Sequence, residues 1–182
     1  MSDAFEQVGS EEIWSGHIGT VRVERYRHAD GEVVTRENVA HPGAVAIVPV
    51  DDRHVWLIRQ PREICGEPAL LEIPAGKLDA DGEDPRAAAE RELAEEIGKA
   101  ARGWEHLKGI YTSPGFTDER IDIFLATDLH DVPQPPAEED ERIEIVPWPL
   151  DRLDDAIAEC QDAKSLIALQ MLRSRREHPA HQ

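Results

Sequence analysis

The sequence predicts an α+β fold, an α/β/α sandwich around a mixed β-sheet, with an antiparallel strand segment ahead of it. Two observations predict this class: strand-like segments separated by short turns dominate the chain, and a single central helix interrupts them before two further helices close it. This order does not fit a repeating β–α–β array. With 182 residues, the chain is expected to form one domain with at most a small appendage.

The N-terminal part divides into an arm and a hairpin. Residues 1–12 are acidic and polar, and we expect them to form an arm that is flexible or depends on a partner for its structure. Residues 13–40 are expected to form a β-hairpin, because runs of alternating apolar and polar residues flank the turn residues Ala29-Asp30-Gly31. The main domain is then expected over residues 41–178.

The main domain begins with a strand over residues 44–50, which is continuously apolar and should be buried on both faces. The central helix is expected to begin at Pro85, with Asp84 as its N-cap, and to end at Gly98. Further strands are expected over residues 54–60, 70–76, 106–113, 120–129 and 142–148, and further helices over 150–160 and 163–176.

The charge of the chain restricts its partners. There are 38 acidic against 20 basic residues, for a net charge of −18. Nonspecific binding to nucleic acid or to an anionic membrane is therefore not expected, whereas a small anionic substrate remains possible if cations line its site. No apolar run approaches the roughly 20 residues of a membrane helix. The N-terminus is unlike a secretory signal, so we expect a cytoplasmic protein.

The central helix carries a cluster of carboxylates. Glu92, Glu95 and Glu96 are spaced by three and four residues, so they are expected to project from one face, opposite to the apolar stripe of the helix. Arg91 can hold Glu95, four residues away, by a charge-assisted bond. A divalent cation such as Mg²⁺ would relieve the remaining repulsion. The alternative is a solvated acidic helix face, which is the more common explanation for a generic EExxE pattern.

The stretch GKLDADGEDPRAAAERELAEEIG, from Gly76 to Gly98, resembles the Nudix box. That pattern is Gly, five residues, Glu, seven residues and then REUxEExGU, where U is a bulky aliphatic residue. Here Gly76 opens the pattern, Glu83 follows, and residues 91–98 complete it. Two departures are one extra residue before Glu83, which leaves its role open, and Lys99 at the last aliphatic position.

The resemblance implies a Nudix fold and a hydrolase that cleaves a nucleoside diphosphate linked to another moiety, by attack of water at phosphorus. Mg²⁺, or Mn²⁺ as a substitute, is the implied cofactor. The implied metal ligands are Glu92, Glu95, Glu96 and the carbonyl of Ala75, and the box also assigns Arg91 and Glu95 to the catalytic machinery.

Two further segments resemble the ADP-ribose pyrophosphatase branch of this family: RQPR at residues 59–62 and YTSPGFTDE at 111–119. The resemblance spans about residues 14–173 and implies a homodimer, with residues 13–40 as the dimerisation segment. Arg36 and Arg62 are the candidates for gripping the diphosphate, since a planar guanidinium pairs well with phosphate oxygens. The other implied substrate contacts are Trp14, which would stack on adenine, and Ser113, Gly115, Phe116 and Glu119.

The resemblance also implies that the base comes from the acidic loop over residues 137–141. Glu139 and Glu141 are the preferred candidates and Glu138 a third, with a solvated loop as the alternative for at least one of them. The leading hypothesis is a Mg²⁺-dependent hydrolase that converts ADP-ribose to AMP and ribose 5-phosphate. A second hypothesis keeps the mechanism for another nucleoside diphosphate sugar, a dinucleoside polyphosphate or an oxidised nucleotide. A third is a noncatalytic ADP-ribose sensor, which the intact RELAEE motif disfavours.

Overall fold

The computed structural model describes residues 4–17, 19–78, 82–135 and 142–178. The chain forms two compact units. We call residues 1–43 with 111–120 the N-terminal unit, and residues 44–110 with 121–182 the core unit. Among the described ranges, no helix is both long and apolar enough to cross a membrane.

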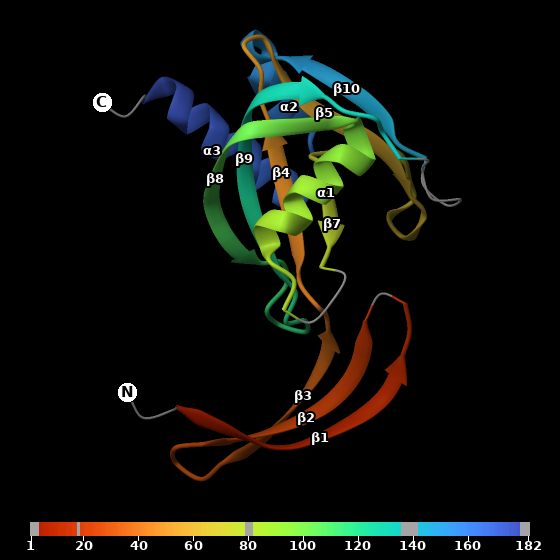
Figure 1. Cartoon of the computed structure of the whole chain (residues 1–182). Helices are drawn as coiled ribbons and strands as arrows, with labels where there is room; N and C mark the ends of the chain where they lie inside the picture. Colours follow the sequence, from red (N-terminus) through yellow and green to blue (C-terminus); the bar gives the residue numbers. More distant parts are fainter. Residues whose placement is uncertain (1–3, 18, 79–81, 136–141, 179–182) are drawn as a thin grey trace. The chain divides into compact units, whose positions relative to one another are not determined.

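The N-terminal unit contains an antiparallel sheet in the order β1-β2-β3 (Figure 1). Its strands are β1 (Phe5–Ser15), β2 (Thr20–His28) and β3 (Val33–Ala40). The hairpin prediction is confirmed by β2 and β3, which join through a turn at Gly31 with a φ of 91°. The flexible arm was a wrong prediction from Phe5 onwards, because β1 pairs with β2 along its length. The polar composition of β1 reflects its exposure, not a lack of structure.

The core unit contains two sheets. A four-stranded sheet has the order β7-β4-β9-β8, with β4 parallel to β9 and antiparallel to β7, and a three-stranded sheet has the order β10-β5-β6. The strands are β4 (Ala44–Pro49), β5 (His54–Arg62), β6 (Glu67–Glu72), β7 (Ala75–Lys77), β8 (Lys99–Tyr111), β9 (Arg120–Asp131) and β10 (Glu144–Pro149).

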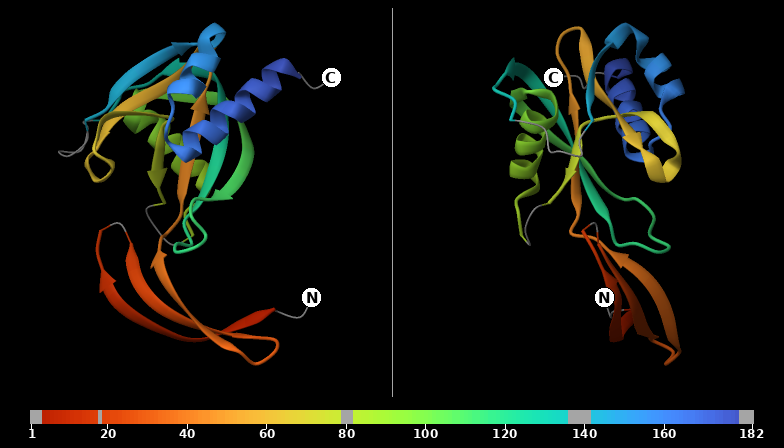
Figure 2. Two further views of the ribbon diagram at one scale, coloured as in Figure 1. Left: turned by 180° about the vertical axis from the view of Figure 1, so that it is seen from behind. Right: turned by 90° about the vertical axis from the view of Figure 1, so that its right-hand side faces the viewer.

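Helices cover both sides of these sheets, with α1 on one side and α2 and α3 on the other (Figure 2). The helices are α1 (Pro85–Ile97), α2 (Leu153–Glu159) and α3 (Ala163–Glu177). Alternate residues of β4 point to opposite sides of the sheet. Val45 and Ile47 belong to the apolar cluster that includes residues of α1, and Ala46 and Val48 belong to the cluster that includes residues of α2 and α3. The sandwich and the two-sided burial of β4 are thus confirmed.

Helix α1 begins and ends as its sequence predicts. The Asp84 side chain accepts a hydrogen bond from the Arg86 amide at 3.2 Å, and Pro85 is the first helical residue. Gly98 takes the left-handed conformation that ends many helices, with a φ of 63°. The next residue, Lys99, is accommodated because its ammonium lies 3.8 Å from the centroid of the Trp56 ring, so this departure from the box does not disturb the helix.

Two strand predictions were wrong in extent. Strand β8 begins at Lys99, seven residues before the predicted start, because sheet pairing with β9 outweighs the weak strand preference of Ala100 and Ala101. The strand predicted over 70–76 is broken at Pro74 into β6 and β7, which belong to different sheets. Proline lacks the backbone N–H that a continuous ladder would use.

Candidate functional site

The carboxylates of α1 lie against β7. Glu96 is 4% exposed, and its Oε2 accepts a hydrogen bond from the Ala75 amide at 2.9 Å. Glu92 is 8% exposed and occupies the space above Gly76, where an added Cβ would lie 1.9 Å from its Oε1. The glycine that opens the box is therefore required by the close approach of a box glutamate.

The prediction that these carboxylates face away from the apolar stripe was wrong for Glu92 and Glu96. Successive helical residues are turned by about 100°, so Glu96 is only about 60° from Leu93 around the helix axis. Glu92 and Glu96 are accordingly buried beside the core, and Glu95 is the more exposed of the three. A solvated acidic face does not describe this helix, because two of its carboxylates are withdrawn from water.

Arg91 holds this cluster together. Its Nη1 donates to Glu92 at 2.6 Å and to Glu95 at 3.1 Å, and its Nη2 donates to the Lys77 carbonyl at 3.1 Å. The predicted pairing of Arg91 with Glu95 is confirmed, and the guanidinium also lies 3.6 Å from Glu83. Glu83 thus joins the cluster despite the extra residue in the turn before it.

The donors of this cluster suit a hard divalent cation. Glu92, Glu95, Glu96 and the Ala75 carbonyl offer oxygen only, the ligand type that Mg²⁺ prefers. In the described ranges, no three carboxylate, imidazole or thiol groups lie together so as to hold a metal ion, since Glu92 and Glu95 converge on Arg91 and Glu96 on the Ala75 amide. Glu92 and Glu95 share one guanidinium, and the buried Glu96 lies four residues from Glu92 on the same helix, so a second positive charge would relieve the remaining repulsion.

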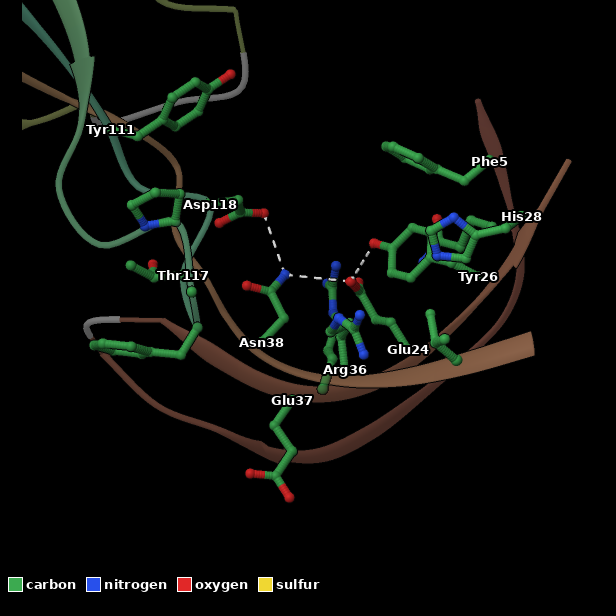
Figure 3. A pocket seen from close by; sticks show the side chains of 16 residues that line it. Phe5, Glu24, Tyr26, His28, Arg36, Glu37, Asn38, Tyr111, Thr117 and Asp118 are labelled. Atoms are coloured by element: carbon green, nitrogen blue, oxygen red, sulfur yellow. Dashed lines mark hydrogen bonds between the residues drawn. The ribbon is translucent and has the colours of Figure 1, made fainter. Parts of the chain in front are cut away.

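The N-terminal unit contains a pocket of about 750 Å³ (Figure 3). Alternate residues of β2 and β3 line it together with the loop 111–120, because side chains two positions apart share one face of a sheet. Three predicted substrate contacts line this pocket: Arg36, Gly115 and Phe116. Its other lining residues are Phe5, Gln7, Arg22, Glu24, Tyr26, His28, Val34, Glu37, Asn38, Tyr111, Pro114, Thr117 and Asp118.

A polar group lies at the centre of this pocket (Figure 3). Glu24 is 7% exposed and accepts a hydrogen bond from the Tyr26 hydroxyl at 2.6 Å, which raises the pKa of Tyr26 to about 12. Asn38 Nδ2 approaches Glu24 at 3.5 Å and Asp118 at 3.4 Å. The pocket therefore combines hydrogen-bonding groups with aromatic rings, a composition typical of small-molecule sites.

The remaining predicted contacts of the N-terminal unit lie outside the pocket lining. The Ser113 carbonyl accepts from the amides of Phe116 and Thr117 at 3.1 Å, and Glu119 accepts from the Thr112 hydroxyl at 2.7 Å, so both shape the loop. Trp14 is 59% exposed, and its ring covers the backbone of Gly16.

Arg62, predicted to grip the diphosphate, is paired with Glu72. Its Nε and Nη2 donate to the two carboxylate oxygens of Glu72 at 2.6 and 2.9 Å, and Lys164 Nζ donates to one of them at 2.6 Å. Burial raises the pKa of Glu72, but the hydrogen bond from Arg62 and the charge of Lys164 outweigh it, so the pKa lies below its ordinary value of 4.5.

This pairing predicts a loss of stability in acid. A carboxyl group whose pKa is lowered by folding contributes stability above its unfolded pKa, and the contribution disappears as the pH falls through the folded value. The free energy of unfolding of the wild type should therefore fall below pH 4.5 more steeply than that of Glu72→Gln. Urea titrations at several pH values measure both slopes; equal slopes would contradict the assignment.

The candidate bases Glu138, Glu139 and Glu141 lie outside the described residues. Among the described ones, sequence reasoning missed Glu72 and the polar group at Glu24, Asn38 and Asp118. Glu72 carried a signal, since a carboxylate inside the apolar stretch LLEIP requires a cationic partner. No signal identified that partner, because Lys164 is 92 residues away.

Comparison with known proteins places the chain in a family. A family model described as the NUDIX domain matches residues 40–169. The chain is 42% identical over 145 residues to the ADP-ribose pyrophosphatase of Mycobacterium tuberculosis, which covers 79% of this chain and 70% of that protein. It is 36% identical over 179 residues to the methanol dehydrogenase activator of Bacillus methanolicus. That match covers 95% of this chain and 96% of the relative.

A solved structure described as an ADP compounds hydrolase superposes with a TM-score of 0.81 at 26% identity, covering 98% of this chain and 97% of that one. The family model spans most of the chain, and two box carboxylates, Glu92 and Glu96, lie on α1 against β7. The chain therefore belongs to the Nudix family and is a Nudix hydrolase.

Proposed function

We propose that this Nudix hydrolase cleaves the diphosphate of ADP-ribose with Mg²⁺ to give AMP and ribose 5-phosphate. The observation that carries the proposal is the burial of Glu92 and Glu96 against β7, beside Gly76 and the Ala75 backbone. Carboxylates that are withdrawn from water would be stabilised by a bound cation, whereas those of a solvated helix face are already stabilised by water. The choice of ADP-ribose draws support from the relative named ADP-ribose pyrophosphatase.

The metal ligands in this proposal are Glu92, Glu95, Glu96 and the Ala75 carbonyl, with Mn²⁺ as a possible substitute for Mg²⁺. The bound cation would neutralise the diphosphate and favour the attack of water at phosphorus. Arg91 keeps Glu92 and Glu95 in place through its two hydrogen bonds.

Proton transfer and substrate binding fall to other residues. A carboxylate of the acidic loop, Glu139 or Glu141, takes a proton from water as the new oxygen–phosphorus bond forms and the bond from phosphorus to the bridging oxygen breaks. Arg62 and Arg36 pair with phosphate oxygens. Trp14 stacks on the adenine, and the other substrate contacts are Ser113, Gly115, Phe116 and Glu119.

A homodimer forms part of the proposal, with residues 13–40 as its interface. The N-terminal unit exposes several large apolar side chains that a second copy would cover. Within residues 13–40 they are Ile13, Trp14 and Val33. Sedimentation of the intact chain measures the mass of the assembly.

Two alternatives keep the fold and change the activity. One is hydrolysis of another nucleoside diphosphate sugar or of a dinucleoside polyphosphate by the same residues. The other is a sensor that controls a partner, to which the relative named for activating methanol dehydrogenase gives some weight. The intact RELAEE motif argues for turnover, because binding alone does not require the metal carboxylates.

Turnover of a substrate panel tests the proposal. We expect kcat/KM with Mg²⁺ to be at least about tenfold higher for ADP-ribose than for GDP-mannose, UDP-glucose or a diadenosine polyphosphate, equivalent to about 1.4 kcal/mol of transition-state binding. ADP-ribose cleaved no faster than the sugar nucleotides would remove the substrate assignment. Binding without turnover of any compound would favour the sensor.

A further inference from the structure

A network of buried charged groups lies behind Arg62 in the core unit. Glu72, at the end of β6, is 1% exposed and receives hydrogen bonds from Arg62 and Lys164. Lys164 Nζ also donates to Asp162 at 3.0 Å. The Asp162 carboxylate in turn accepts from the Ser165 amide at 3.0 Å, which caps α3. Two cations and two anions thus balance, and the network joins β5, β6 and α3.

The geometry of the Arg62–Glu72 pair fixes the guanidinium plane. Nε and Nη2 bind the two oxygens of one carboxylate, which is the bidentate arrangement that sets the orientation of an arginine most firmly. The carboxylate cannot turn, because Lys164 binds one of the same oxygens. Arg62 therefore has a single orientation imposed from behind.

The other edge of the guanidinium points out of the network. The Arg62 side chain is 43% exposed, against 1% for that of Glu72. Within the described part of the chain, Nη1 makes no hydrogen bond, so its two N–H groups are available to an anion. The Glu96 charge is among those that raise the pKa of Arg62, so the guanidinium lies within electrostatic reach of that box carboxylate.

Stability alone does not account for this network. A buried ion pair seldom stabilises a fold more than apolar side chains of the same volume would, because the charges must first leave water. Here the charges support one arginine whose side chain is partly exposed. The chain runs from Glu72, the last residue of β6, through Ile73 and Pro74 to Ala75, the first residue of β7, so the network and the carboxylate cluster are linked by a short backbone segment.

We infer that Glu72 is a positioning residue for substrate: it holds Arg62 so that Nη1 is presented to an oxyanion of the diphosphate. This inference rests on the proposed hydrolysis of a diphosphate and extends it to a residue that does not touch the substrate. Lys164 contributes by fixing Glu72, and it connects the position of α3 to the orientation of Arg62.

The first test is Glu72→Gln, assayed by steady-state kinetics. A glutamine offers one acceptor oxygen in place of two charged ones, so the guanidinium loses its fixed plane. We expect KM to rise roughly tenfold while kcat stays within about threefold, as for a contact made equally in the ground and transition states. An unchanged KM would overturn the inference.

Leu169→Ala is the matched control for stability. Leu169 lies on α3, as Lys164 does, but it is fully buried in the apolar core and takes no part in the charged network. The variant should lower the Tm because it leaves a cavity, and it should leave KM unchanged because Arg62 and Glu72 keep their pairing. A rise in KM of similar size in this control would assign the effect of Glu72→Gln to general loosening and overturn the positioning role.

Two further variants test the positioning role of Glu72 if Glu72→Gln does not fold. Arg62→Lys retains the positive charge but has a single ammonium group. It cannot pair with both oxygens of Glu72 and also present a separate N–H group to the substrate, so KM should rise in this variant as well. The double variant Arg62→Ala with Glu72→Gln, if it folds, should bind no worse than Arg62→Ala. A normal KM in Arg62→Lys, or additive losses in the double variant, would overturn the inference.

The assay uses the diphosphate that the wild type cleaves fastest in the panel. A substrate other than ADP-ribose then overturns the proposed function and leaves the test of Glu72 intact. If the wild type only binds, the dissociation constant for ADP-ribose replaces KM, with the same expected changes.

Discussion

Changing Glu96 to Gln is expected to lower kcat for diphosphate hydrolysis by about 10³-fold or more. Glutamine has nearly the shape of glutamate, and its carbonyl oxygen can still accept the Ala75 amide that Glu96 accepts at 2.9 Å. The fold should therefore survive, while the charge that would bind a divalent cation is lost. Single-turnover and steady-state rates at saturating Mg²⁺ measure the change.

Glu90→Gln is the matched control on the same helix. Glu90 is exposed and pairs only with Arg86 among the described residues, at 2.8 Å. Its rate should stay within about twofold of the wild type, since surface pairs of this kind contribute little. A near-normal rate in Glu96→Gln, or an equal loss in Glu90→Gln, would mean that the box is not the catalytic centre.

The second large loss of activity is expected at Gly76, a residue that has no side chain. Gly76→Ala should lower kcat/KM by about 10²-fold, because the added Cβ would lie 1.9 Å from Oε1 of Glu92 and 2.0 Å from its Cδ. The obstructing atoms are the end of a flexible side chain, so Glu92 can move aside. Catalysis should suffer much more than folding.

The measurements for Gly76→Ala are the Tm, the affinity for Mn²⁺ and kcat/KM. We expect a small change in Tm and a weaker Mn²⁺ affinity. Because the variant acts through Glu92, combining it with Glu92→Gln should give no further loss of activity. Unfolding of Gly76→Ala, or losses that add in the double variant, would contradict this explanation of the box glycine.

The sequence was most informative where local chemistry decides the structure. Helix α1 was predicted at both ends because Asp84, Pro85 and Gly98 act through their own backbone and near neighbours. Strand β4 was recognised as buried on both faces because its six residues are all apolar except for its final proline, an interpretation that needs no partner. The carboxylates of α1 were found in the same way, from their spacing along one helix.

Contacts between distant parts of the chain were beyond sequence reasoning. The loop 111–120 joins β3 through Val39 and Thr117, and Asn38 approaches Asp118 across 80 residues. In both pairs, nothing in the sequence around one residue identifies the other as its contact. The alternation of residues along β2 and β3 would have grouped Glu24 with Tyr26, but the loop that completes the pocket depends on tertiary structure.

The burial of charged groups is the feature that the sequence patterns predicted least well. Spacing placed Glu92, Glu95 and Glu96 together, but the contact of Glu96 with Ala75 depends on how α1 packs against β7. Arg62 was selected for its resemblance to a family motif, and its pairing with Glu72 appears only in the folded chain. Both cases show charges held by neighbours in preference to water, which the sequence pattern alone does not reveal.

The most direct test of the central claim is a Mg²⁺ titration of metal-free protein with ADP-ribose, in which AMP and ribose 5-phosphate are quantified by ion-exchange chromatography. We expect no turnover without metal and a saturable rise in both products, in equal amounts, as Mg²⁺ is added. Turnover that persists in the absence of metal, or no AMP at any Mg²⁺ concentration, would contradict it.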